Sequence, residues 1–361
     1  MRIVVAMSGG VDSSAVAGLL HEAGHEVVGI TLQLYDHGAA IGRKNACCAG
    51  QDIHDARRVA DHLGIPHYVI DAEARFAGTV INAFADSYAR GETPVPCVQC
   101  NTGVKFPNLL ALARDLRAER LATGHYVRRL DGPDGPELHR AVDSARDQSW
   151  FLFGTTREQL DFTLFPLGDM PDKQTVRAEA ARLGLPVAEK ADSQDICFVP
   201  AGNYADLVAR LRPDATGHGE IVNRAGRVLG RHDGIARFTV GQAKRLGEAA
   251  IDRGQRQVVI ALDAGRRRVV VGARSTGSHR VTVRDANWLV PPPGDPLRCA
   301  VKLRAREQPQ PALVRASGGG AEVCLDSPAL AAPGQACVFY DGTRVLGGGF
   351  IQRSTDAGDR C

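Results

Sequence analysis

The sequence predicts an α/β protein with an N-terminal doubly wound parallel sheet, a small central domain and a C-terminal all-β barrel. Apolar runs of strand length alternate with amphipathic helical stripes in the first part of the chain. From Thr216 onward, short β-like runs separated by Gly and Asp replace the helices. The length of 361 residues is large for a single core. We therefore expect three domains, at residues 1–209, 210–278 and 279–361.

Charge is distributed unevenly along the chain. Residues 1–209 carry 20 Lys and Arg against 27 Asp and Glu, a balance of −7, whereas residues 210–361 carry 24 against 14, a balance of +10. A basic half favours a polyanionic partner such as nucleic acid, although a solvated surface alone would explain the charge equally well. Nine cysteines, an odd number, argue against a disulfide framework. We expect a cytoplasmic protein, because neither a membrane-spanning run nor a secretory signal pattern is evident.

The first strand and helix are predicted to enclose an anion-binding loop. An apolar run, Arg2–Met7, is followed by Ser8-Gly9-Gly10-Val11-Asp12-Ser13 and then by apolar residues at helical spacing. Adjacent glycines let the backbone approach a ligand closely, and free N–H groups at a helix start attract an anion such as pyrophosphate. The string is not a Walker loop and lacks G-x-G-x-x-G, and an ordinary strand-to-helix turn is the plain alternative.

Further strands are expected at Glu26–Leu34, His67–Ile70 and Arg120–Ala122. Ligands of parallel sheets bind at the carboxyl ends of strands. We therefore expect the Ser8 loop, Leu32 and the segment Thr123-Gly124-His125 on one rim of the sheet.

Two cysteines in C-x-x-C spacing follow two prolines that forbid a regular helix before them. Cys97 and Cys100 should lie on a loop or at a helix start, where a thiol pKa is lowered, and Lys105 would add to that effect. A redox pair, half of a metal site and one reactive thiol are all possible. Ordinary structural zinc is disfavoured, because the chain has no second C-x-x-C.

Two more segments are ambiguous by themselves. Arg146-Asp147-Gln148 precedes Ser149-Trp150 and is typical of a helix cap before core residues, with contact to nucleic acid as the functional alternative. Cys197 lies on a short apolar segment and would usually be a core residue. Beside another loop cysteine and a Ser8–Ser13 loop that resembles the pyrophosphate loop of ATP pyrophosphatases, it becomes a candidate sulfur carrier.

The C-terminal half shows β-like runs at regular intervals. The runs are Gly219–Val222, Val228–His232, Ala236–Val240, Gln255–Leu262, Arg268–Val271, Val301–Arg306, Glu322–Leu325, Ala336–Tyr340 and Val345–Ile351.

Five strings in this order resemble the bacterial tRNA-specific 2-thiouridylases, PP-loop enzymes of the ATP pyrophosphatase superfamily. The strings are Ala6–Ser13, Pro96–Asn101 with Lys105-Phe106, Ala122–Tyr126, Arg146–Ser149 and Asp192–Phe198. The resemblance extends over nearly the whole chain, since Pro333–Tyr340 matches as well.

The resemblance implies ATP-dependent replacement of the 2-oxygen by sulfur on the wobble uridine of tRNAs for Lys, Glu and Gln. Cys197 would carry a persulfide received from a cysteine desulfurase or sulfur relay protein. Cys100 would release its sulfur or form a transient Cys100–Cys197 disulfide. ATP, with Mg²⁺, would be held by Ala6, Met7, Ser8, Gly9, Gly10, Val11, Asp12, Ser13, Leu32 and Gly124. The tRNA would be contacted by His125, Arg146, Asp147, Gln148 and Gln335.

This chain departs from the family at one motif. Many members carry Asn-Pro-Asp where Val95-Pro96-Cys97 stands here, so the role of that Asp is not carried over. Cys97 instead makes a trio with Cys100 and Cys197, and a [4Fe-4S] cluster on these three is an alternative sulfur chemistry for the same reaction. A C–N ligase of the same superfamily, which would not need Cys100 or Cys197, and a non-catalytic RNA-binding protein are alternatives of other classes.

Overall fold

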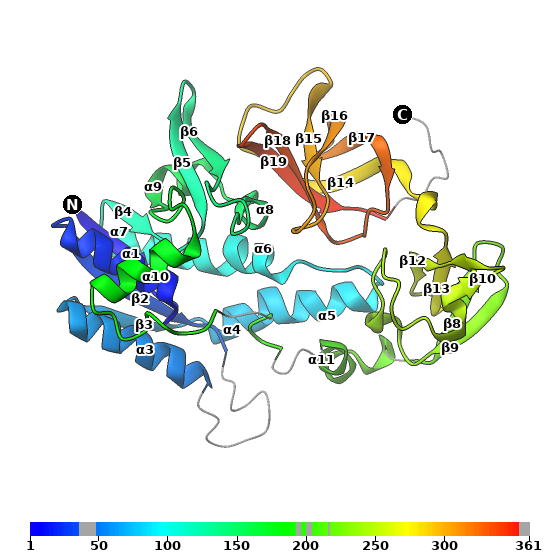
Figure 1. The fold of residues 1–361 in the computed structure, drawn as a ribbon, viewed down its shortest axis with the longest axis horizontal. Coiled ribbons are helices and arrows are strands. Elements are labelled where there is room, and N and C mark those ends of the chain that lie inside the picture. Colours follow the sequence, from blue (N-terminus) through cyan, green and yellow to red (C-terminus); the bar gives the residue numbers. More distant parts are fainter. Residues whose placement is uncertain (36–47, 193–195, 200–203, 216, 354–361) are drawn as a thin grey trace. The chain divides into compact units, whose positions relative to one another are not determined.

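The computed structural model describes residues 1–35, 48–192, 196–199, 204–215 and 217–353 (Figure 1). The chain divides into two compact units, which are taken separately below. The first comprises Met1–Val80, Cys97–Pro200 and Thr343–Val345, and the second comprises Ile81–Pro96, Ala201–Gly342 and Leu346–Cys361.

The first unit is built on a parallel sheet in the order β3-β2-β1-β4-β7. The strands are β1 (Arg2–Ala6), β2 (Glu26–Gln33), β3 (His67–Asp71), β4 (Arg120–Ala122) and β7 (Thr163–Leu164). The central strand is buried at Ile3, Val4 and Val5, as expected for a sheet covered on both faces. The predicted parallel sheet is confirmed.

Helices connect these strands and cover the sheet. Right-handed crossovers from β1 to β2 and from β2 to β3 place α1 (Val11–Glu22) and α3 (Cys48–Leu63) on one face. The return from β3 to β4 places α7 (Phe106–Asp115) on the other face, against β1 and β4. Helix α10 (Lys173–Arg182) packs on α1. The remaining helical segments are α4 (Glu73–Phe76), η1 (Ala77–Ile81), α6 (Pro96–Cys100), η2 (Asn101–Lys105), α8 (Ser149–Leu152) and α9 (Arg157–Phe162).

An antiparallel hairpin, absent from the sequence prediction, follows β4. It consists of β5 (Val127–Gly132) and β6 (Gly135–Arg140), and β6 pairs with Arg344 through His139. The turn residues Gly132-Pro133-Asp134-Gly135 were an available signal. The hairpin was not predicted because the strands on either side of this turn are rich in charged residues and show no apolar run.

The second unit contains a four-stranded sheet in the order β12-β13-β8-β9. Its strands are β8 (Gly219–Asn223), β9 (Val228–His232), β12 (Val258–Asp263) and β13 (Arg268–Gly272), with a short pair β10 (Ile251–Asp252) and β11 (Gln255–Arg256) beside them. Helices α5 (Asn82–Ala89) and α11 (Tyr204–Leu211) pack on each other. Short helical turns are η4 (Pro213–Ala215), η5 (Ile235–Arg237), η6 (Gly247–Ala250) and η7 (Arg274–Thr276).

The strand expected at Ala236–Val240 is wrong. The segment begins as the helical turn η5, and Ile235, Ala236 and Phe238 are all buried, with Ile235 and Phe238 in the core of the four-stranded sheet. Burial alternates from Ala236 to Val240 much as it would in a strand, so the pattern alone does not distinguish this segment from a strand.

A closed antiparallel barrel completes the second unit. Its strands are β14 (Ser278–Trp288), β15 (Leu297–Lys302), β16 (Gln310–Ser317), β17 (Gly320–Ala329), β18 (Ala336–Asp341) and β19 (Arg344–Ile351). They follow the order β14-β17-β16-β15-β18-β19, and the pairing of β19 with β14 closes the ring, which leaves no free edge among these described strands. The barrel prediction is confirmed. The strand expected at Val301–Arg306 ends earlier, at Lys302.

None of the helices among the described residues combines the length and apolar character needed to span a membrane.

Candidate active site

The loop between β1 and α1 is held in shape by its own serines. The Ser8 amide donates to the Ser13 hydroxyl at 3.0 Å, and the two serine hydroxyls lie 3.1 Å apart. The Ser14 hydroxyl donates to the Gly10 carbonyl at 2.8 Å. These bonds fix the first turn of α1. The N-cap residue, Gly10, has no side chain that could cap the helix start. Backbone N–H groups of this turn therefore remain available to an anion.

Two glycines are required by close packing around this loop. Gly9 has φ +73°, and a Cβ there would lie 2.1 Å from the Asp52 carbonyl oxygen. A Cβ on Gly124, which follows β4, would lie 2.9 Å from the Ser13 amide nitrogen. The expected rim is therefore real at this point: Gly124 lies directly against the loop. Leu32 lies near the end of the neighbouring β2 and is partly exposed.

Charged side chains converge on both ends of the loop. The Lys173 ammonium lies 2.6 and 2.7 Å from the two carboxylate oxygens of Asp12, and the Tyr126 hydroxyl donates to Asp12 at 2.6 Å. The Lys190 ammonium donates to the Gly9 carbonyl at 3.0 Å and also pairs with the carboxylates of Asp52 and Asp55 of α3. The sequence analysis named neither lysine, because each lies far along the chain from its partners.

Cys97 and Cys100 lie on α6, as one of the two sequence alternatives placed them. The helix widens into the π-helical turn η2, which places Lys105 at its end, before α7 continues. Such bulges are frequent at functional sites. Cys100 is buried, whereas Cys97 and Cys197 each retain an exposed surface.

All three thiols share the electrostatic field of Lys105. Burial raises the pKa of Cys197 to about 11 and also raises the pKa values of Cys97 and Cys100, although Lys105 lowers all three. The expectation of a lowered thiol pKa at this helix start is therefore wrong, because desolvation outweighs the cation. Burial opposes the charge of Lys105 itself, but the ionising thiols outweigh it and the pKa of Lys105 is raised.

Aromatic side chains pack together next to Cys197 in the sequence and in space. The Phe198 ring packs edge-on against the Phe76 ring, with 5.6 Å between the ring centroids. The Tyr35 ring also packs against Phe76, with 5.9 Å between the centroids. Tyr35 also forms a hydrogen bond with the Cys197 sulfur that lowers the pKa of the thiol, against the larger effect of burial. Tyr35 was not identified from the sequence, since only the fold brings it to Cys197.

Comparison with known proteins shows the family to which this chain belongs. Residues 1–201 match the family described as the tRNA methyl transferase HUP domain, residues 206–273 the tRNA methyl transferase PRC-barrel domain, and residues 278–351 the aminomethyltransferase β-barrel domain. The tRNA-specific 2-thiouridylase MnmA of Acidiphilium cryptum is 69% identical over 97% of this chain and 100% of its own length. The protein of the same name from Gluconobacter oxydans is 62% identical over 97% of this chain and 99% of its own.

The chain belongs to the tRNA-specific 2-thiouridylase family. The resemblance drawn from five sequence strings is thereby confirmed. The protein is an enzyme, a sulfurtransferase that acts on tRNA, and the C–N ligase and non-catalytic alternatives are set aside.

The residues that the resemblance assigned to tRNA differ in their exposure and in their hydrogen bonds within the protein. In this 2-thiouridylase, the Asp147 carboxylate accepts from the Ser149 hydroxyl at 2.9 Å and from Arg140 at 3.2 Å, and its side chain is 1% exposed. The Gln148 side-chain oxygen accepts from the Tyr126 amide at 2.9 Å. The side chains of Asp147 and Gln148 are thus used in hydrogen bonds within the protein. Arg146, in contrast, is an exposed cation of this segment.

His125 follows Gly124 and is tied to Thr123 by a 3.0 Å hydrogen bond. Burial, together with the charge of Lys105, lowers the pKa of His125 to about 3. Its ring is therefore neutral at physiological pH and offers a hydrogen bond or a stacking face in place of a charge.

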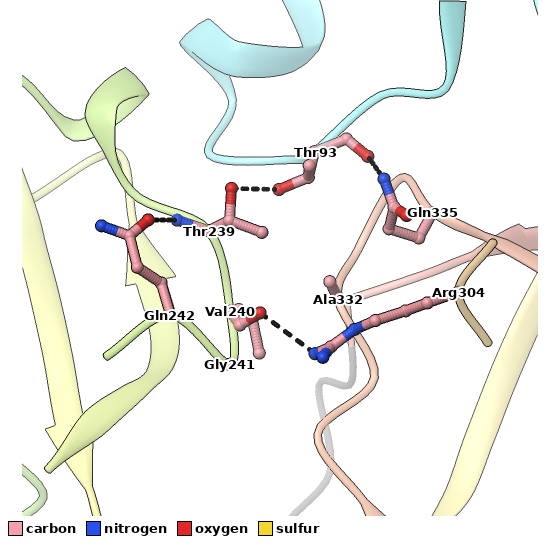
Figure 2. A pocket seen from close by; sticks show the side chains of 8 residues that line it. All are labelled: Thr93, Thr239, Val240, Gly241, Gln242, Arg304, Ala332 and Gln335. Atoms are coloured by element: carbon pink, nitrogen blue, oxygen red, sulfur yellow. Dashed lines mark hydrogen bonds between the residues drawn. The ribbon is translucent and has the colours of Figure 1, made fainter. Parts of the chain in front are cut away.

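Gln335 lines a pocket of about 280 Å³ within the second unit (Figure 2). Its side-chain amide donates to the Thr93 carbonyl at 3.0 Å. Arg304 donates to the carbonyls of Val240 and Leu330 at 3.2 and 2.9 Å. The cavity is lined by Thr93, Thr239, Val240, Gly241, Gln242, Arg304, Ala332 and Gln335.

The three thiols do not fit an iron–sulfur cluster well. Within the part of the chain that the structure describes, no group of three or more His, Cys, Asp or Glu side chains is arranged to hold a metal ion.

Proposed function

We propose that this enzyme uses ATP to replace the 2-oxygen of the wobble uridine of tRNA by sulfur carried on Cys197. One observation carries the proposal: the charge of Lys105 acts on the thiols of both Cys100 and Cys197. These residues belong to the same unit as the sheet that bears the Ser8–Ser13 loop. The loop supplies activation and the thiols supply sulfur. The relatives are named for 2-thiouridylation of tRNA, which matches this pair of functions.

Adenylation is the first step. The loop residues Ala6–Ser13 hold the phosphates of ATP, with Leu32 and Gly124 on the nucleoside side, and Asp12 supplies a carboxylate of the kind that Mg²⁺ prefers. The uracil 2-oxygen attacks the α-phosphorus, the bond to the bridging oxygen breaks, and pyrophosphate leaves. The amide-like 2-oxygen is a poor leaving group, and after adenylation it leaves C2 as part of AMP, a good leaving group.

Sulfur transfer is the second step. The terminal sulfur of a Cys197 persulfide attacks C2 of the adenylated uracil, and AMP leaves with the bonding electron pair. The Cys100 thiolate then attacks the Cys197 sulfur, which breaks the S–S bond, releases 2-thiouridine and leaves a Cys100–Cys197 disulfide. Alternatively, Cys100 attacks the persulfide first and frees sulfide for the attack on C2. An external thiol reduces the disulfide, and an upstream persulfide donor such as a cysteine desulfurase reloads Cys197.

The tRNA is held by contacts of two kinds. Arg146 provides charge, and His125, Asp147, Gln148 and Gln335 provide or shape polar contacts. The net charge of +10 over residues 210–361 favours salt-dependent contacts with tRNA phosphates. We assign these contacts to two β domains, at residues 210–278 and 279–361. We propose tRNAs for Lys, Glu and Gln as substrates and the cytoplasm as the location.

The test is mass spectrometry of tRNA nucleosides after incubation of the enzyme with ATP, unmodified tRNA and a persulfide donor. 2-Thiouridine should form only with ATP present, together with equal amounts of AMP and pyrophosphate. Anaerobically purified protein should contain no iron and retain full activity. Formation of 2-thiouridine without ATP, or strict dependence on bound iron, would contradict the proposal.

A further inference from the structure

Lys173 has no role in the steps above, yet it is an enclosed cation at the nucleotide loop. Its side chain is 9% exposed. Its ammonium lies 2.6 Å from an oxygen of Asp12 and 3.0 Å from an oxygen of Asp192. A buried ammonium is costly unless it is paired, so the two carboxylates account for its stability in this position.

The two carboxylates that hold Lys173 have different surroundings. Asp12 is the second residue of α1, at the point where phosphates would bind, and its other partner is the neutral Tyr126 hydroxyl. Asp192 lies outside the loop and is paired with Arg146 at 2.7 Å and Arg177 at 3.0 Å. Asp192 can therefore keep Lys173 in place when Asp12 turns to another partner.

We propose that Lys173 binds the pyrophosphate portion of ATP and stabilises pyrophosphate as it leaves, with Asp192 as the positioning residue that aims the ammonium. The inference rests on the proposed function of the loop. A divalent cation that accompanies ATP would take over the Asp12 carboxylate, and the ammonium it releases would already lie beside the phosphates. Negative charge grows on the leaving pyrophosphate during adenylation, and a cation fixed at that place stabilises it.

The test compares the binding of inorganic pyrophosphate with that of AMP, both by calorimetry in the presence of Mg²⁺. Lys173→Met should weaken pyrophosphate binding by about tenfold to a hundredfold, the usual value of a hydrogen bond to a charged group. AMP affinity should change by no more than about twofold, because AMP lacks the β and γ phosphates. Thermal unfolding verifies that the variant is folded.

Arg182→Met is the matched control. Arg182 lies on the same helix α10 and pairs with Glu22 of α1 at 2.6 Å, so the variant also removes a cation and an α1–α10 ion pair. It should leave pyrophosphate affinity unchanged. Asp192→Asn, which keeps the size of the side chain, should weaken pyrophosphate binding by about threefold to tenfold and serves if Lys173→Met does not fold.

The outcomes separate the inference from the function on which it rests. If the wild-type enzyme binds neither ATP nor pyrophosphate, the proposed role of the loop fails. If the wild type binds both and Lys173→Met, or Asp192→Asn in its place, binds pyrophosphate equally well, the inference is overturned and the loop's role stands. Equal losses of AMP and pyrophosphate affinity would mean general damage to the loop and would also overturn it.

Discussion

The nucleotide loop and the thiol cluster lie in the same unit but have opposite electrostatic designs. At the loop, Asp12 and the carboxylates of Asp52 and Asp55 each have an ammonium partner within 2.7 Å. In the cluster, Cys97, Cys100 and Cys197 share one cation, Lys105, and burial keeps all three thiol pKa values above their ordinary value.

This difference matches the chemistry expected at each place. A loop that receives a polyanion benefits from fixed N–H groups and from cations already in place, because neither must reorganise when the ligand arrives. Thiols that stay protonated are protected from oxidation and from premature attack. Lys105 then stabilises whichever sulfur loses its proton.

The sharpest way to separate the two regions is to remove the sulfur chemistry alone. Cys197→Ser and Cys100→Ser should each lower the formation of 2-thiouridine by at least about 10³-fold, since a hydroxyl cannot carry or resolve a persulfide. ATP–pyrophosphate exchange, measured in the presence of tRNA, should stay within about threefold of wild type because the loop is intact.

Cys299→Ser is the control for that pair. Cys299 lies on β15 of the second unit, whereas the three thiols belong to the first, so its replacement should leave both measurements unchanged. If pyrophosphate exchange disappeared together with thiolation in Cys197→Ser, the two regions would not be separable as described.

A steric change at the loop should have the converse effect. Gly9→Ala would place a Cβ 2.1 Å from the Asp52 carbonyl oxygen at φ +73°, and both α3 and the loop would have to shift. Nucleotide affinity should fall by about tenfold or more, since strain of this kind costs on the order of 1–3 kcal/mol. The reactivity of Cys197 toward an alkylating reagent should not change.

Gly24→Ala is matched to this variant in backbone conformation. Gly24 has φ +79°, but a Cβ at this position would meet no described atom within 4 Å, so only the left-handed backbone is penalised. The substitution should lower the unfolding free energy by about 1 kcal/mol and leave nucleotide affinity intact. Equal affinities of the two variants would mean that the contact with Asp52 is unimportant.

Replacing Lys105 tests the thiol cluster itself. Because burial raises the pKa of Cys197 to about 11, its alkylation rate should rise about tenfold per pH unit between pH 7 and 9 without levelling off. Lys105→Met removes a charge that lowers this pKa, so less thiolate forms, and the rate at pH 8 should fall by about threefold to tenfold.

The measurement can be assigned to one sulfur. Trypsin releases residues 191–210 as a peptide in which Cys197 is the sole cysteine. Lys190→Met, which removes a lysine that contacts the loop at the Gly9 carbonyl, should leave this rate within about twofold of wild type. Its tryptic peptide begins at Leu183 instead and still contains Cys197 as the sole cysteine. A plateau below pH 9, or an equal effect of the two lysines, would contradict the contrast between the regions.

The two regions also differ in how far the sequence predicts them. The loop was predictable because strand, glycines and helix start are contiguous, and the fold confirms their placement. The cation beside Asp12 was not, because Lys173 is 161 residues away and nothing near it in sequence marks it. The direction of the thiol pKa values was also missed, since local spacing indicates a helix start and a lysine but gives no measure of desolvation.

The smallest expected effect concerns the residue that departs from the family motif. Cys97 shares the field of Lys105 but has no step in persulfide transfer, so Cys97→Ser should keep the formation of 2-thiouridine within about threefold of wild type. Cys97→Asp introduces the carboxyl group that the family resemblance places at this position and should act similarly. A cluster held by three cysteines would instead lose its ligand, and activity would fall as far as in Cys100→Ser. Parallel assays of the three variants under anaerobic conditions therefore decide whether the three sulfurs act as free thiols or hold a cluster.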